Sequence, residues 1–75
     1  MKYAREVIGL MAAHPGRDWR MVEIVRYVDD SKENRHRVRI GVLRVLKELE
    51  TCGSVLIRPP RTIRGGYALY RWRET

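Results

Sequence analysis

The chain has 75 residues, of which 44% are hydrophobic and 33% are charged, so it predicts one small domain over residues 1–75 with a single modest core. Its formal net charge is +7, from 16 Lys and Arg against 9 Asp and Glu. The sequence has no apolar run of about 18 residues for a membrane span and no signal-peptide pattern. We therefore expect a cytoplasmic location.

The first 30 residues predict two helices joined by a short extended segment. Apolar residues recur at helical spacing over residues 2–13. Pro15 and Gly16 end this helix, because Pro cannot continue it and Gly accepts a left-handed turn. The second helix is expected over residues 21–28. Trp19, in the link, is expected to cover the junction between the two helices and to lie in a possible short strand.

The third predicted helix has an apolar side and a basic side. Asp30 and Glu33 have the spacing of a capping box, with Ser31 as an alternative cap, and the helical pattern continues to Glu50. At about 100° per residue, the apolar side carries Val38, Val42, Val45, Leu46 and Leu49. The opposite side carries Arg37, Ile40, Arg44 and Lys47, flanked by His36 and Leu43, with Arg35 and Arg39 nearer the apolar side.

A β-hairpin is expected after the third helix. Gly53 ends the helix, and residues 55–57 begin a strand. The Pro59-Pro60 pair cannot donate to a sheet, so strand pairing should stop there before residues 67–73 return. Helices followed by strands in this order predict an α+β domain.

The single cysteine, Cys52, excludes an internal disulfide and a cysteine-based metal site. We expect Cys52 to be a small buried residue, as free cysteines often are.

The positive charge is concentrated in the third helix and the hairpin. Residues 1–30 hold five Lys or Arg and five Asp or Glu, residues 31–50 hold six and three, and residues 51–75 hold five and one, so the excesses are 0, +3 and +4. Thirteen of the sixteen cations are Arg, which favours bidentate contact with phosphate or guanine. The pattern indicates a nucleic-acid-binding surface and does not separate DNA from RNA.

Residues 46–55, Leu-Lys-Glu-Leu-Glu-Thr-Cys-Gly-Ser-Val, together with the order of elements, resemble the winged helix-turn-helix family of small bacterial and phage transcriptional regulators. In that family the recognition helix typically ends in a Leu-x-x-Leu-Glu-x-x-Gly-x-Val pattern before a two-stranded wing. The resemblance implies a winged helix of three helices and a β-hairpin wing. It also implies regulation of transcription through double-stranded DNA, with the third helix in the major groove and the wing on the flanking backbone or minor groove.

The candidate DNA contacts are Arg35, His36, Arg37, Arg39, Arg44 and Lys47 on the third helix, and Arg58, Arg61 and Arg64 on the wing. Arg37, Arg44 and Lys47 are expected at base edges or phosphates, and Arg61 and Arg64 are stronger wing candidates than Arg58. Arg35 and Arg39 either contact phosphate or lay their stems over the core. Ile40 either touches a thymine methyl or belongs to a packing or partner surface.

Two other functions remain open. One is a protein-interaction adaptor, with Ile40 and Leu43 at the contact and the arginines facing an acidic partner. The other is single-stranded nucleic-acid binding through Tyr67, Tyr70 and Trp72, although we expect Tyr70 and Trp72 to lie in the core. Tight sequence-specific DNA binding by one domain this small would be easier for a homodimer or with a regulatory protein partner, because paired modules enlarge the contact area. The sequence indicates no enzymatic activity, cofactor, metal site, small-molecule ligand or membrane partner.

Overall fold

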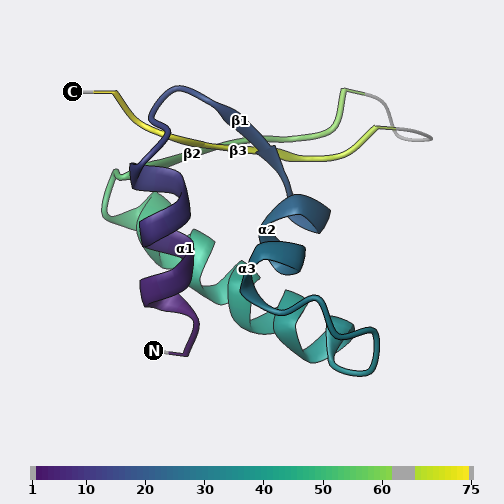
Figure 1. Ribbon diagram of the computed structural model, residues 1–75. Coiled ribbons are helices and arrows are strands. Elements are labelled where there is room, and N and C mark those ends of the chain that lie inside the picture. Colours follow the sequence, from purple (N-terminus) through teal and green to yellow (C-terminus); the bar gives the residue numbers. More distant parts are fainter. Residues whose placement is uncertain (1, 62–65, 75) are drawn as a thin grey trace.

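Three helices and three strands make up the described part of the chain (Figure 1). The computed structural model describes residues 2–61 and 66–74. The elements, in chain order, are α1 (Ala4–Ala12), β1 (Asp18–Arg20), α2 (Met21–Val28), α3 (Arg35–Thr51), β2 (Val55–Arg58) and β3 (Leu69–Trp72). The expected α+β class is confirmed. No described helix has the length and apolar character of a membrane span.

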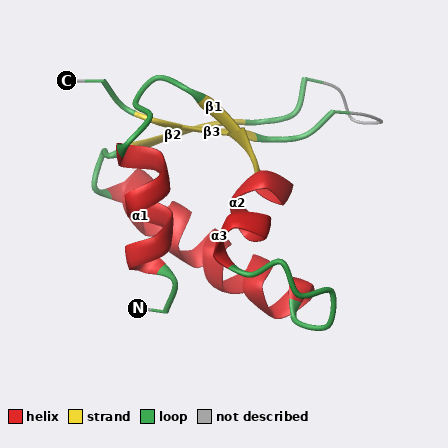
Figure 2. Cartoon of the chain, in the orientation of Figure 1, coloured by secondary structure: helices red, strands yellow, loops and turns green. Residues whose placement is uncertain are grey.

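The strands form one antiparallel sheet in the order β1-β3-β2. In the hairpin, Val55 pairs with Trp72 at one end and Arg58 with Leu69 at the other, so pairing stops before the two prolines, as expected. The strand expected near Trp19 is confirmed as β1, which pairs with β3. All three helices lie on one side of the sheet, which gives the domain two layers (Figure 2).

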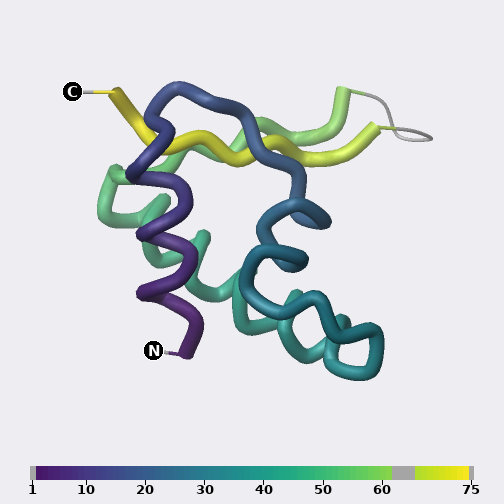
Figure 3. The backbone as a smooth tube through the Cα atoms, viewed as in Figure 1, coloured from purple at the N-terminus to yellow at the C-terminus, as the bar shows by residue number. Residues whose placement is uncertain are grey.

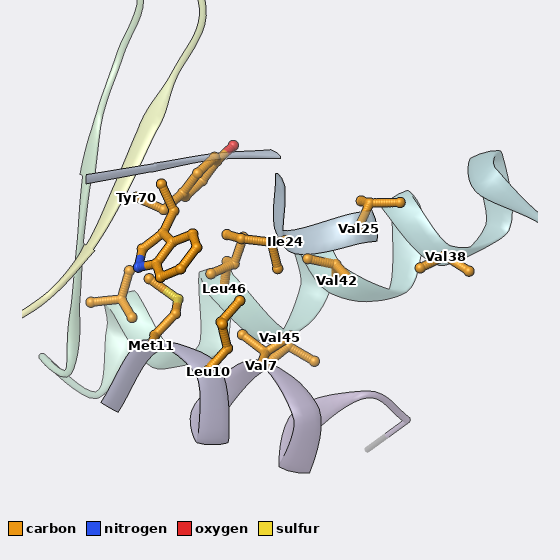
Figure 4. Close-up of a cluster of buried hydrophobic side chains, with 12 residues drawn as sticks. Val7, Leu10, Met11, Ile24, Val25, Val38, Val42, Val45, Leu46 and Tyr70 are labelled. Carbon is orange, nitrogen blue, oxygen red and sulfur yellow. The ribbon is translucent and has the colours of Figure 1, made fainter. Parts of the chain in front are cut away.

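One hydrophobic core fills the space between the layers (Figure 4). Trp19, Val55 and Tyr70 enter it from the three strands, because alternate residues of a strand face the same way. The helices contribute Val7, Leu10, Met11, Ile24, Val25, Val38, Val42, Val45 and Leu46. The apolar side predicted for the third helix is therefore confirmed. Trp72 packs against this core and stays partly exposed.

The start of α3 differs from the prediction. The helix begins at Arg35, and neither Asp30 nor Ser31 is its N-cap. Instead, Asp29 Oδ1 accepts a hydrogen bond of 2.9 Å from the Ser31 backbone N–H, and a turn follows over the next three residues. A side chain that binds the backbone two residues on holds the chain in a turn and competes with helix formation.

The end of α3 is held by a Schellman arrangement. Gly53 has a φ of 84°, its N–H donates to Glu50 O at 3.0 Å, and the Ser54 N–H donates to Leu49 O at 2.8 Å. These two bonds satisfy helix carbonyls that would otherwise lack partners. The expectation that Cys52 is buried is wrong: it is exposed at the C-cap, because the turn starts at the next residue, outside the core.

Two helical glycines have different surroundings. A Cβ added to Gly41 of α3 would lie 2.6 Å from two carbons of the Tyr3 ring, whereas one added to Gly9 of α1 would meet nothing within 4 Å. Alanine is about 1 kcal/mol more favourable than glycine inside a helix. We expect Gly9→Ala to raise the free energy of unfolding by up to that amount. Gly41→Ala should raise it less or lower it, because the Tyr3 ring must move.

Urea unfolding followed by circular dichroism measures both changes. Equal gains in the two variants would contradict the close approach of Tyr3 to α3.

Candidate nucleic-acid interface

Most of the exposed charge of α3 is positive. Its five cations all have exposed side chains: Arg35, Arg37, Arg39, Arg44 and Lys47. None of them forms an ion pair with a carboxylate of the described residues. His36 is also exposed. The acids of this helix, Glu48 and Glu50, lie near its C-terminal end. The first three turns of α3 therefore present positive charge that no described acid neutralises.

Helical geometry arranges these cations in two rows. At about 100° per residue, Arg35 and Arg39 fall in one row, one turn apart. Arg37 and Arg44 fall in a second row, roughly 160° around the axis from Arg39. The stripe between the rows carries His36, Ile40, Leu43 and Lys47. The helix thus has two cationic flanks and a mixed central stripe.

The row of Arg35 and Arg39 faces α2 and the part of the hairpin just before β3. Both arginines line a hollow together with Tyr67, which precedes β3. Burial raises the pKa of the Tyr70 hydroxyl, and the charge of Arg39 opposes that rise. The side chains of Arg35 and Arg39 are exposed at a hollow that is also lined by the core residue Val25, and their contact with phosphate stays a prediction.

The central stripe has two apolar members, Ile40 and Leu43, which differ in exposure. Ile40 is 45% exposed, whereas Leu43 is half-buried. Packing of Ile40 in the core is therefore excluded, and its side chain is available to a ligand. Lys47 is exposed two turns further along the same stripe.

The wing candidates differ from one another. Arg58 Nη1 lies 3.9 Å from Asp18 Oδ2, so its charge is shared with an acid. Arg61 is exposed and has no ion pair among the described residues. Arg64 lies outside the described residues. Of these two described arginines, Arg61 is therefore more available to bind phosphate than Arg58. Arg61 stays the stronger predicted wing contact.

Asp18 and Arg71 form a two-pronged ion pair on the outer face of the sheet. Arg71 Nε donates to Asp18 Oδ1 at 2.9 Å, and Nη2 donates to Oδ2 at 3.0 Å. These hydrogen bonds from Arg71 hold the pKa of the Asp18 carboxyl below its usual value of 3.8. Asp18 is therefore ionised at neutral pH and remains a partner for the nearby Arg58. The sequence did not reveal this pair, because its members lie on strands far apart in the chain.

The N-terminal part of the chain adds cations that the sequence did not single out. Arg20 lies over the ring of Tyr67, with its Cζ atom 3.9 Å from the ring centroid. Arg26 lines the same hollow as Arg35 and Arg39. The hairpin and the connection between α2 and α3 project to the same side of the molecule (Figure 3). Residues 1–30 thus bring two arginines to this surface together with two acids, Asp29 and Asp30, and the local excess of positive charge comes from Arg35 and Arg39.

No family model, curated protein or solved structure matches this chain. Within residues 2–61 and 66–74, no three His, Cys, Asp or Glu side chains gather in a group that could hold a metal ion. The exposed cations of α3 and the hairpin are therefore the main features that point to a function.

Proposed function

We propose that the chain is a winged helix-turn-helix domain that binds double-stranded DNA, with α3 as its recognition helix. The observation that carries this proposal is the pair of exposed arginine rows on α3. None of the four arginines forms an ion pair with an acid of the described residues. The arrangement of three helices on one face of a sheet that ends in a hairpin supports it. A role in regulating transcription rests on the resemblance to small winged regulators.

The two rows suit the major groove of B-DNA. That groove is about 12 Å wide and admits one α-helix, and a phosphate backbone borders it on each side. In the proposed complex, Arg35 and Arg39 face one backbone and Arg37 and Arg44 face the other. Phosphate contacts of this kind set position and orientation and carry no sequence information directly.

The central stripe would then face the base pairs. Lys47 offers a donor to the O6 and N7 acceptors of guanine, and Ile40 offers an apolar surface to a thymine methyl group. His36 lies nearer the start of the stripe. The hairpin lies beside the row of Arg35 and Arg39. From the hairpin, Arg61 would reach the flanking phosphate.

Binding of single strands through the aromatic residues is less well supported. Tyr70 is buried, and the guanidinium of Arg20 lies over the ring of Tyr67. Trp72 is half-buried against the core. These three rings do not form the open stacking surface that single-strand binding requires.

The test is binding of a fluorescently labelled duplex of random sequence, followed by anisotropy. Arg35→Ala/Arg39→Ala and Arg37→Ala/Arg44→Ala each remove one row, and each is expected to weaken binding about 10-fold or more at 0.1 M salt, because two phosphate contacts are lost. The matched control, Lys2→Ala/Arg5→Ala, removes two exposed cations at the start of the chain and should change affinity less than about 2-fold.

An equal loss in the control would mean that only net charge matters, and failure of the wild-type chain to bind would refute duplex binding. Ile40→Ala tests the stripe separately. It is expected to change which duplexes are selected from a random library more than it changes overall affinity.

A further inference from the structure

A hollow between α2 and α3 shares Arg35 and Arg39 with the proposed duplex contacts, but its apolar lining has no part in them. Its volume is about 270 Å³. Apolar side chains of α2 form part of its lining: Met21, Val22 and Val25. Met21 and Val22 are only half-buried, so apolar surface remains open to solvent at a place where no described element covers it.

The lining of the hollow is rich in guanidinium groups. Arg20, Arg26, Arg35 and Arg39 belong to it, against two acids, Asp29 and Asp30. Asp29 already accepts the hydrogen bond from the Ser31 backbone. None of the four arginines forms an ion pair with an acid among the described residues. The hollow therefore combines an apolar surface with a local excess of positive charge.

The volume of the hollow and its positive charge together indicate which kind of ligand it can bind. Small-molecule pockets usually measure about 300 to 1,000 Å³ and bury most of the ligand, whereas this hollow is smaller and open to solvent. It matches one large side chain, the kind of anchor that a protein partner inserts into a surface pocket. A second copy of the chain would bring a further charge of +7 toward the same arginines. An acidic partner fits the charge.

We propose that the hollow between α2 and α3 binds an acidic segment of a partner protein that inserts one aromatic side chain between Val22 and Val25. The acidic residues on either side of that side chain pair with the surrounding arginines. This site differs from the adaptor surface predicted at Ile40 and Leu43, neither of which lines the hollow. It also does not depend on duplex binding.

Three pentapeptides test this proposal with the wild-type chain and no DNA. The first has a central tryptophan with two acidic residues on each side. The second replaces the tryptophan with alanine, and the third replaces the acidic residues with lysine. We expect the first to bind at least 10 times more tightly than either of the others, measured by anisotropy of labelled peptide.

Two variants locate the peptide on the protein. Val22→Glu places a carboxylate in the apolar lining and is expected to weaken the first peptide more than 10-fold. Arg26→Ala removes an exposed cation of the hollow that belongs to neither arginine row of α3, so it should weaken the peptide several-fold and weaken duplex binding less than the loss of either row does. Its readout also remains valid if Val22→Glu fails to fold. The control Arg37→Ala/Arg44→Ala should leave peptide binding unchanged.

Several results would overturn the proposal. If the alanine peptide binds as tightly as the tryptophan peptide, the interaction depends on charge alone and the aromatic anchor is refuted. If the tryptophan peptide does not bind, the proposed acidic partner is refuted. Indole-3-acetate binding as tightly as the tryptophan peptide would assign the hollow to small anions. Self-association that Val22→Glu abolishes would assign it to a second copy. Because duplex binding is measured separately, either proposal can fail while the other stands.

Discussion

Leu46→Ala is expected to lower the free energy of unfolding by about 3 kcal/mol, within the usual range of about 2 to 5 kcal/mol for a buried leucine. Leu46 has no exposed surface and is among the largest fully buried side chains of the core. It lies on α3 and points toward Ile24 and Met11 (Figure 4). The core of so small a domain rarely supplies more than about 3 to 5 kcal/mol, so the variant should keep no more than about 2 kcal/mol of stability.

Leu56→Ala is the matched control, because Leu56 is 51% exposed. This leucine lies on β2 with its side chain on the sheet face away from the helices. The same truncation there should cost less than about 0.5 kcal/mol. Urea unfolding of both variants, followed by helical circular dichroism and by fluorescence of the buried Trp19, measures the difference. Equal costs for the two leucines would contradict the assignment of Leu46 to the core.

Duplex affinity is expected to fall about 150-fold between 50 and 200 mM salt if the four arginines of the two rows each neutralise one phosphate. Each neutralised phosphate releases counterions, so the logarithm of the binding constant falls with the logarithm of salt concentration with a slope of about −0.9 per phosphate. Four such contacts give a slope of about −3.6, and any contact from Arg61 makes it steeper.

The change in this salt-dependence slope gives the number of phosphate contacts that a variant removes. Arg37→Ala/Arg44→Ala is expected to make it less steep by about 1.8, and so is Arg35→Ala/Arg39→Ala. Anisotropy titrations at four or more salt concentrations give these slopes. A wild-type slope near zero would rule out the proposed backbone contacts. A slope that stays at the wild-type value after a row is removed would show that this row does not meet phosphate.

The parts of the fold that depend on local patterns could be predicted from sequence. The bounds of α2 agree with the expected 21–28, because apolar spacing marks a helix that packs on one side. The apolar side of α3 was also found. The start of α3 was missed, because the Ser31 backbone N–H donates to Asp29 and holds a turn there, and a turn of this kind looks like a capping box in sequence.

The parts that depend on tertiary placement could not be predicted. The pairing of Asp18 with Arg71 follows from the register between β1 and β3, which no local pattern encodes. The stacking of Arg20 on Tyr67 likewise joins residues far apart in the chain. The sequence located the basic helix correctly, but only the fold showed that the row of Arg35 and Arg39 faces the hairpin.

The Schellman arrangement at Gly53 has a consequence for the length of α3. Its two hydrogen bonds lock the rotational phase of α3 to the sheet, because only a few residues separate the helix from β2. One residue inserted into the last turn would rotate the preceding helix by about 100° relative to the hairpin. The stripe that carries Ile40 and Lys47 would then turn away from its place, and the apolar side with Val42 and Val45 would leave the core. If α3 reads DNA as proposed, a new specificity is therefore accessible through substitution along the stripe and closed to changes in helix length.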